Sequence, residues 1–179
     1  MSFLRRLRGE PNVPRPADVA PVYTQLRQAV LDLDPTSVGI ERGPAERRVW
    51  GLVMDWSVGD AIATIVSLAD GTTSLYLSSG GGSIGAGEHE APAAASINAI
   101  RVADAMVDEF PMVEHAPIPG RGRTALTLLT DLGLRRVEED NAAFEEGTSR
   151  FAPVADAMQH VIHEIRVAEA GSPARRSPG

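Results

Sequence analysis

The chain has 179 residues, is 43% hydrophobic and carries a formal net charge of −7, which predicts one globular domain around a single core. Nucleic acids and anionic membranes reward clustered positive charge, so we expect no nucleic-acid partner for a chain this acidic. The sequence contains no cysteine, and all 17 of its basic residues are arginines. Disulfides, cysteine metal sites and mechanisms that need a lysine amine are therefore excluded in their standard forms, and we expect no cofactor.

The two ends of the chain differ in composition from the middle. Residues 1–15 combine arginines with prolines and lack the apolar stretch of a signal peptide, so we expect a flexible basic tail and a cytoplasmic protein. No apolar run approaches the roughly 20 residues that a membrane-spanning helix needs, and we expect no stable membrane insertion. Residues 171–179 are predicted to be a second disordered tail, which leaves residues 16–170 as a single domain.

The first half of the domain is predicted to contain one helix and three strands. Apolar residues spaced by three and four positions indicate a helix over residues 16–33. Three strand-like segments follow, at residues 49–56, 61–69 and 73–78. Asp70 and Gly71 tolerate the positive φ angles of a tight hairpin turn. The pattern therefore predicts a three-stranded antiparallel meander.

The second half is predicted to alternate helix, strands and helix. A helix over residues 92–110 ends where Phe110 precedes Pro111, because a residue before proline avoids the helical region. The remaining predicted elements are strands at 123–130 and 134–138, an acidic loop at 138–146 and a helix at 153–168.

This order, α-β-β-β-α-β-β-α, predicts an α+β fold with a roughly five-stranded, mainly antiparallel sheet and helices packed on one face. The other face is then solvated, covered by a terminal segment or paired with another copy. Alternation along residues 49–56 predicts that Trp50 and Trp56 share one face of the first strand. That face is expected in the core under the helices or, alternatively, in a dimer interface.

The glycine-rich segment 78–90 is the strongest candidate for a functional loop. Glycine lets a ligand or another chain approach the backbone closely, at an entropic cost on folding. The predicted binding residues are Gly80, Gly81, Gly82, Ser83, Ile84, Gly85, Gly87 and His89. A tight bend or a packed backbone crossing is the alternative explanation of these glycines.

Gly80, Gly82 and Gly85 also form a literal G-x-G-x-x-G, but the context does not favour a dinucleotide site. In that fingerprint the helix begins within the glycines, so that its N-terminus meets the pyrophosphate. Here the predicted helix starts later, and Glu88 and Glu90 would oppose an incoming phosphate at its N-terminus.

Two side-chain groups offer weaker chemical hypotheses. Glu88 beside His89 could form an acid–base pair, because a carboxylate orients a neighbouring imidazole and raises its pKa. On the last helix, His160, His163 and Glu164 share one face and could bind a metal, although their order matches no zinc-binding motif. A solvated helix face with ion pairing explains the same residues, and we expect no metal site.

The string Ser-Ser-Gly-Gly-Gly-Ser-Ile-Gly-Ala-Gly-Glu-His at residues 78–89, placed after a β-meander, resembles a family of short uncharacterised bacterial proteins. The resemblance is clearest over residues 50–90 and implies no activity, ligand or partner. No functional residue is carried over from it.

We therefore expect a non-enzymatic cytoplasmic binding or assembly module, a homodimer that uses the glycine-rich loop as its contact surface, with itself or another protein as partner. The alternative is a small-molecule or phosphate-ester binding protein or hydrolase that uses the loop amides with His89 and Glu88.

Overall fold

The computed structural model describes residues 19–40 and 49–171 of the chain. Seven strands form one sheet in the order β4-β3-β2-β1-β6-β7-β5, and each neighbouring pair is antiparallel. The strands are β1 (Val49–Val58), β2 (Ala61–Leu68), β3 (Thr73–Leu77), β4 (Gly82–Ile84), β5 (Met112–Val113), β6 (Arg123–Thr130) and β7 (Gly133–Asp140). The predicted tail at residues 1–15 and all but the first residue of the one at 171–179 lie outside the described residues.

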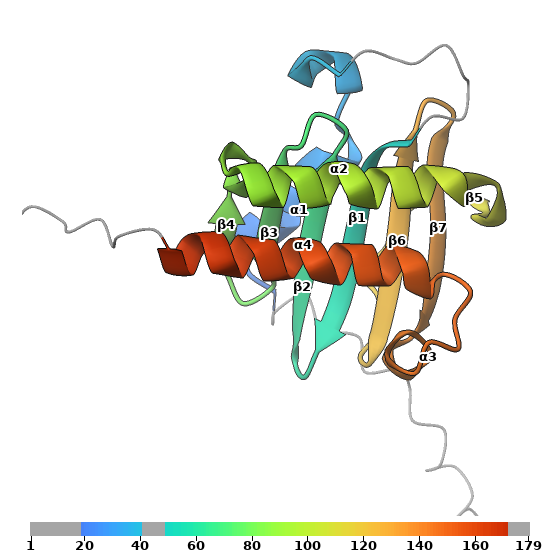
Figure 1. The fold of residues 1–179 in the computed structure, drawn as a ribbon. Coiled ribbons are helices and arrows are strands. Elements are labelled where there is room, and N and C mark those ends of the chain that lie inside the picture. Colours follow the sequence, from blue (N-terminus) through green and yellow to red (C-terminus); the bar gives the residue numbers. More distant parts are fainter. Residues whose placement is uncertain (1–18, 41–48, 172–179) are drawn as a thin grey trace, which may run out of the picture.

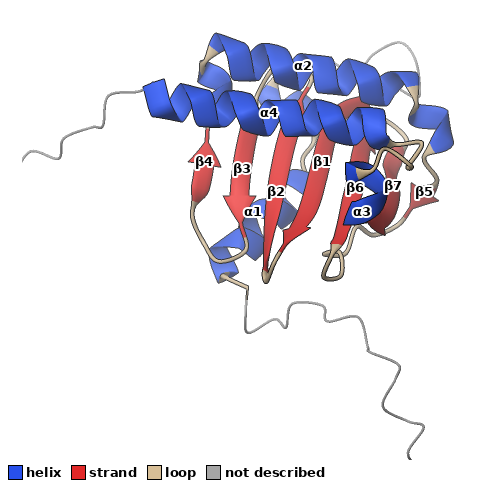
Figure 2. Ribbon diagram, turned by 60° about the horizontal axis from the view of Figure 1, so that its bottom comes forward, coloured by secondary structure: helices blue, strands red, loops and turns tan. Residues whose placement is uncertain are grey.

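Helices cover both faces of the sheet. The α-helices are α1 (Pro21–Leu31), α2 (Glu90–Ala105), α3 (Asn141–Glu145) and α4 (Ala152–Gly171), and the short 3-10 helices are η2 (Pro35–Val38), η3 (Ala86–Glu88) and η4 (Val107–Glu109). The long helices α2 and α4 lie side by side across one face, and α1 lies against the other (Figures 1 and 2). The fold is therefore α+β, as predicted, with three layers.

Each face of the sheet has its own hydrophobic core. On the side of α2 and α4, strand residues such as Leu52 and Leu126 pack against Met158 and Ile165 of α4, and all four are fully buried. On the side of α1, Tyr23 packs with strand residues that include Val53, Ile62 and Val66. The central strands β1, β2 and β6 are thus buried on both faces.

The structure corrects two parts of the predicted architecture. The sheet has seven strands rather than five, because part of the glycine-rich segment forms β4 and Met112–Val113 pairs with β7 as β5. The helices do not lie on one face only, because the apolar stripe of α1 packs on the opposite face from α2 and α4. Neither added strand exceeds three residues, too short for a periodic pattern to show in the sequence.

The predicted position of the two tryptophans is also wrong. The pairing of β1 with β6 shifts register between Val49 and Gly51, and such a bulge moves the residues before it to the other face. Trp50 consequently packs in the α1 core, whereas Trp56 packs against the core under α2 and α4. Both side chains are used in packing, so the expected face with two tryptophans does not exist.

The acidic segment at residues 138–146 is not the predicted loop. Its first residues continue β7 to Asp140, and the next five form the helix α3. Among the described residues, no helix combines the length and the apolar character needed to cross a membrane.

Candidate functional site

The glycine-rich segment begins as a hairpin between β3 and β4. The Gly80 amide donates to the Leu77 carbonyl at 2.9 Å, and the Leu77 amide donates to the Gly81 carbonyl at 3.1 Å. Gly80 and Gly81 have φ angles of 94° and 86°, in a region that disfavours side chains with a Cβ atom. These two glycines let the chain reverse direction and add β4 to the sheet.

Two other glycines are required because another backbone segment passes close to them. A Cβ atom on Gly82 would clash with the Leu75 carbonyl oxygen of the paired strand, and one on Gly87 would lie 2.5 Å from the Gly71 carbonyl oxygen. Gly87 therefore packs against the β2–β3 turn. The glycines of this segment therefore serve both a tight bend and a packed backbone crossing. The part of the segment left for contact with another molecule is the exposed edge of β4.

That exposed edge carries an apolar surface. Within the described residues, β4 is the last strand at its end of the sheet and pairs only with β3. The Ile84 side chain on β4 is 70% exposed, Val22 on α1 is 50% exposed and Leu77 is 36% exposed. We call these three residues the edge patch.

A pocket of about 170 Å³ accompanies the edge patch. All three patch residues line it, and its other described lining residues are Tyr23, Leu26, Tyr76, Gly81 and Gly82. None of these side chains carries a charge at neutral pH. Helix α1 forms one wall and the glycine hairpin forms the other, so the pocket depends on how α1 is held against the sheet.

A buried polar cluster holds α1 in that position. Arg27 of α1 donates from Nε to Asp55 Oδ1 at 3.0 Å and from Nη2 to Asp55 Oδ2 at 2.7 Å, and Nη2 also donates to the Ala116 carbonyl at 2.8 Å. Thr64 donates its hydroxyl to Asp55 Oδ1 at 2.6 Å, and the Tyr23 hydroxyl lies 2.8 Å from the Thr64 hydroxyl. Asp55 is fully buried and Arg27 is 5% exposed.

The surroundings of this cluster perturb two pKa values. Burial and the nearby Asp55 carboxylate raise the pKa of Tyr23 to about 12, although Thr64 and Arg27 act in the other direction. Burial alone would lower the pKa of Arg27, but the hydrogen bonds and charge of Asp55 raise it above its ordinary value. Buried charges are tolerated when they are paired and hydrogen-bonded in this way.

The sequence analysis did not predict this cluster, although the sequence contains a signal of a buried ion pair. Arg27 lies four residues after Tyr23 and therefore on the same face of the helix as that largely apolar side chain. Asp55 lies between Met54 and Trp56 in a strand with few polar residues. A charge of each sign within otherwise apolar elements is the pattern of a buried ion pair.

The proposed acid–base residues lie at the surface, where η3 leads into α2. Glu88, His89 and Glu90 are all exposed, and His89, although it precedes α2, makes no capping hydrogen bond with its side chain. Ser78, in the same loop, is buried and accepts a hydrogen bond from the Ile62 amide. Neither His89 nor Glu88 lines the pocket beside the glycine hairpin.

The histidines of α4 lie on the solvent side of the helix. His160 Nε2 is 3.7 Å from Glu164 Oε1, and the rings of His160 and His163 stack with their centroids 6.3 Å apart. Over residues 19–40 and 49–171, no group of three or more histidine, cysteine or acidic side chains is arranged to hold a metal ion.

The chain matches no protein-family model, no curated protein and no solved structure, so comparison with known proteins assigns it to no family. The class that the fold defines is an α+β domain with a seven-stranded antiparallel sheet covered on both faces.

Proposed function

We propose that this protein is a non-enzymatic assembly module that forms a homodimer through β4 and the edge patch. The observation that supports this proposal is the 70% exposure of Ile84 on a strand at the end of the sheet, next to two further exposed apolar side chains. An edge strand presents unpaired backbone donors and acceptors, which a second strand can satisfy.

The charge distribution is compatible with a second copy of the chain as the partner. A chain with a net charge of −7 repels its own copies at long range, so self-association needs a contact surface free of like charges. The pocket and the edge patch carry no charged side chain among the described residues. A two-fold axis through β4 would place this apolar surface against itself, as an isologous interface requires.

The mass of the protein in solution tests this proposal. Light scattering over a range of protein concentrations is expected to give a dimer for the wild type and a monomer for Ile84→Arg, because the variant places a charge at the centre of the apolar contact. Leu132→Arg is the matched control, since Leu132 is 49% exposed in the β6–β7 turn, four strands away from β4 in the sheet. A monomeric wild type, or an Ile84→Arg variant that remains dimeric, contradicts the proposal.

The phosphate-ester alternative makes a different prediction. It requires phosphates to stabilise the folded protein in a thermal-shift measurement, because a ligand that binds only the native state raises the melting temperature, and it requires His89→Ala to abolish that effect. No observation of the site favours it, since the exposed His89 and Glu88 do not line the pocket at the loop.

A further inference from the structure

A pocket of about 190 Å³ lies between α3 and α4, at the end of the sheet where β1 ends and β6 begins. It is on the side of the sheet that α2 and α4 cover, and Figures 1 and 2 show α3 beside the first turns of α4. Residues of β1 and β6 form its floor, and residues of α3 and α4 form its two walls. We call it the α3 pocket.

The interior of the α3 pocket is apolar. Met54 and Ala155 are buried in the core, and Trp56 and Phe144 are partly buried and pack against that core. A cavity of roughly 150 Å³ is large enough for a benzene ring, so the α3 pocket has room for one aromatic ring and little more. Aromatic side chains in the lining favour such a ring, because aromatic rings pack well against each other.

The polar side chains inside the pocket already have partners. The Thr124 hydroxyl donates to Asn141 Oδ1 at 2.8 Å, and Asn141 Nδ2 donates to the Ser57 carbonyl at 2.7 Å. The interior therefore requires no hydrogen bond from a ligand, and the part of the ligand that enters it is expected to be apolar.

The opening of the α3 pocket carries two carboxylates. Glu145 of α3 and Asp156 of α4 line the pocket from its two walls, and both are exposed, so a ligand can reach them. Within residues 19–40 and 49–171, neither carboxylate is paired with an arginine or a histidine. No basic side chain is among the described lining residues. An opening lined by charges of one sign attracts ligands of the opposite sign, which here are cations.

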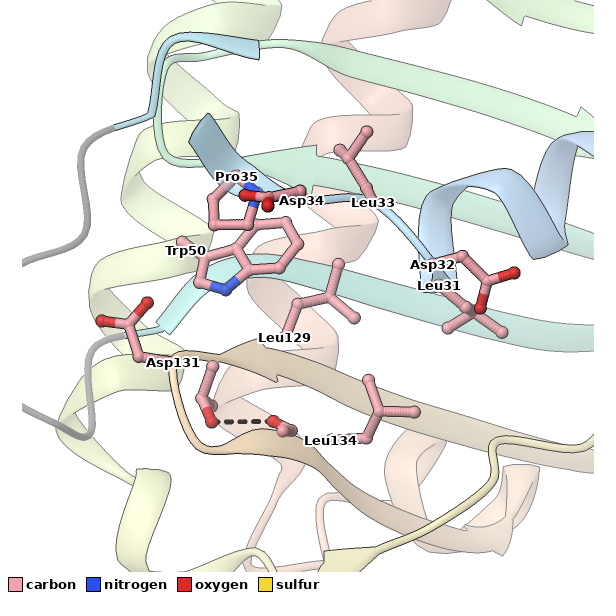
Figure 3. Close-up of a pocket in the computed structure, with 11 residues that line it drawn as sticks. Leu31, Asp32, Leu33, Asp34, Pro35, Trp50, Leu129, Asp131 and Leu134 are labelled. Atoms are coloured by element: carbon pink, nitrogen blue, oxygen red, sulfur yellow. Dashed lines mark hydrogen bonds between the residues drawn. The ribbon is translucent and has the colours of Figure 1, made fainter. Parts of the chain in front are cut away.

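A larger pocket on the α1 face offers no comparable groups. Figure 3 shows this pocket, which has a volume of about 360 Å³ and lies between the end of α1 and the β6–β7 turn. Asp32 and Asp34 in its wall accept hydrogen bonds from neighbouring residues, and the Oδ1 atom of Asp131 is buried. Its size alone specifies no ligand, whereas the α3 pocket combines a ring-sized apolar interior with reachable, unpaired carboxylates.

We propose that the α3 pocket binds a small arylalkylamine, an aromatic ring joined by a short chain to an ammonium group. The ring enters the interior beside Trp56 and Phe144, and the ammonium group stays at the opening with Glu145 and Asp156. Because the opening is exposed to water, each ion pair has the modest strength of a surface pair. The site lies on the opposite face of the sheet from the edge patch and does not depend on dimerisation.

Calorimetric titration of the wild-type protein with a set of related probes tests the chemical class. Phenethylammonium carries both the ring and the charge, phenylethanol keeps the ring without the charge, phenylpropionate reverses the charge, and butylammonium keeps the charge without the ring. We expect saturable binding of phenethylammonium and at least about tenfold weaker binding of each other probe. The affinity for phenethylammonium is also expected to fall as salt is added, because exposed ion pairs are screened.

Charge-matched variants test the two carboxylates. Glu145→Gln and Asp156→Asn are each expected to weaken phenethylammonium binding about threefold, as for the loss of one exposed ion pair. Glu146→Gln removes the same charge from the next residue, which is exposed but does not line the pocket, and it is expected to leave binding unchanged. All three positions are exposed, so each variant is expected to fold.

Variants of the interior test the place of the ring. Ala155→Met fills the pocket and keeps both carboxylates, and it is expected to weaken phenethylammonium binding at least about tenfold, because the longer side chain occupies the volume of the ring. Phe144→Leu removes one aromatic side chain of the lining and gives a second measurement of the same effect if Ala155→Met does not fold. It is expected to weaken binding about threefold.

Four results would each overturn the proposal. These are the absence of phenethylammonium binding, equally tight binding of phenylethanol or butylammonium, equal weakening by Glu145→Gln and Glu146→Gln, and unchanged binding in the interior variants.

Discussion

The titration of Tyr23 gives the most direct quantitative test of the α1 face. The pKa of Tyr23 is raised from 10.0 to about 12 in the folded protein, mainly by burial. In the unfolded chain the phenol loses its proton near pH 10, whereas in the folded protein it keeps the proton until about pH 12. The stability contributed by Tyr23 is therefore fully present below pH 10 and is lost as the pH rises to 12.

The magnitude follows from the size of the shift. Two pKa units at about 1.4 kcal/mol each correspond to a loss of about 3 kcal/mol of unfolding free energy across this window. The composition makes the window unusually simple to interpret. The sequence has no lysine and no cysteine, and arginine keeps its proton in this range, so none of these side chains obscures the titration of Tyr23.

Urea unfolding at a series of pH values between about 9 and 12 measures this loss. The wild type is expected to lose about 3 kcal/mol, and Tyr23→Phe is expected to remove most of the decline, although its stability starts lower because the hydrogen bond with Thr64 is gone. Tyr76→Phe, which keeps Tyr23, is the control and is expected to retain the decline. A parallel decline in the wild type and in Tyr23→Phe would refute the reasoning.

Two further predictions concern the buried polar cluster and the glycine segment. Arg27→Met is expected to cost about 3–5 kcal/mol of unfolding free energy in urea, because it leaves the fully buried Asp55 without its cation. The double variant Arg27→Met/Asp55→Leu is expected to recover most of that loss, and a cost below about 1 kcal/mol for the single variant would contradict the assigned pairing. Gly87→Ala is expected to destabilise the protein more than Gly81→Ala in the same assay, because only the Gly87 Cβ would meet a neighbouring backbone atom, at 2.5 Å, whereas Gly81 has open space despite its positive φ. The opposite order would show that backbone conformation outweighs close packing in this segment.

Elements with a long periodic pattern could be predicted from the sequence. The strands of the meander and the helix that ends before Pro111 depend on local spacing, turn residues and the restriction that proline places on its neighbour. The observed strands of the meander agree with the predicted ranges to within two residues. The helix is shorter than predicted, because α2 ends at Ala105 and the 3-10 helix η4 (Val107–Glu109) takes up most of the remaining segment before Pro111. The α+β class follows from their order.

The side of the sheet on which a residue lies could not be predicted in the same way. A single bulge after Val49 places Trp50 opposite to the face that strict alternation predicts, and a bulge leaves no periodic signal in one strand. The position of α1 depends on the contact between Arg27 and Asp55, which are 28 residues apart. Long-range pairing of this kind requires a tertiary arrangement that sequence spacing does not specify.

The candidate site was predictable in part. The glycine-rich segment drew attention to Ile84, and the structure exposes that side chain on an edge strand. The other two members of the edge patch, Val22 and Leu77, were assigned only to a helix and a strand, because nothing local indicates that they meet the hairpin. The pocket lined by Trp50, Leu129 and Leu134 likewise combines residues from distant segments of the chain, and the sequence analysis did not predict it.

The short strands at the two edges of the sheet limit the kind of polymer that this chain can form. β4 has three residues and β5 has two, whereas the central β1 has ten. If two copies join through β4, their sheets merge into one that ends in β5 at both extremities. A two-fold pairing uses the β4 edge of both copies, and β5 adds only two residues at the other end, so growth through β4 stops after a single pairing and the assembly is finite rather than a fibre.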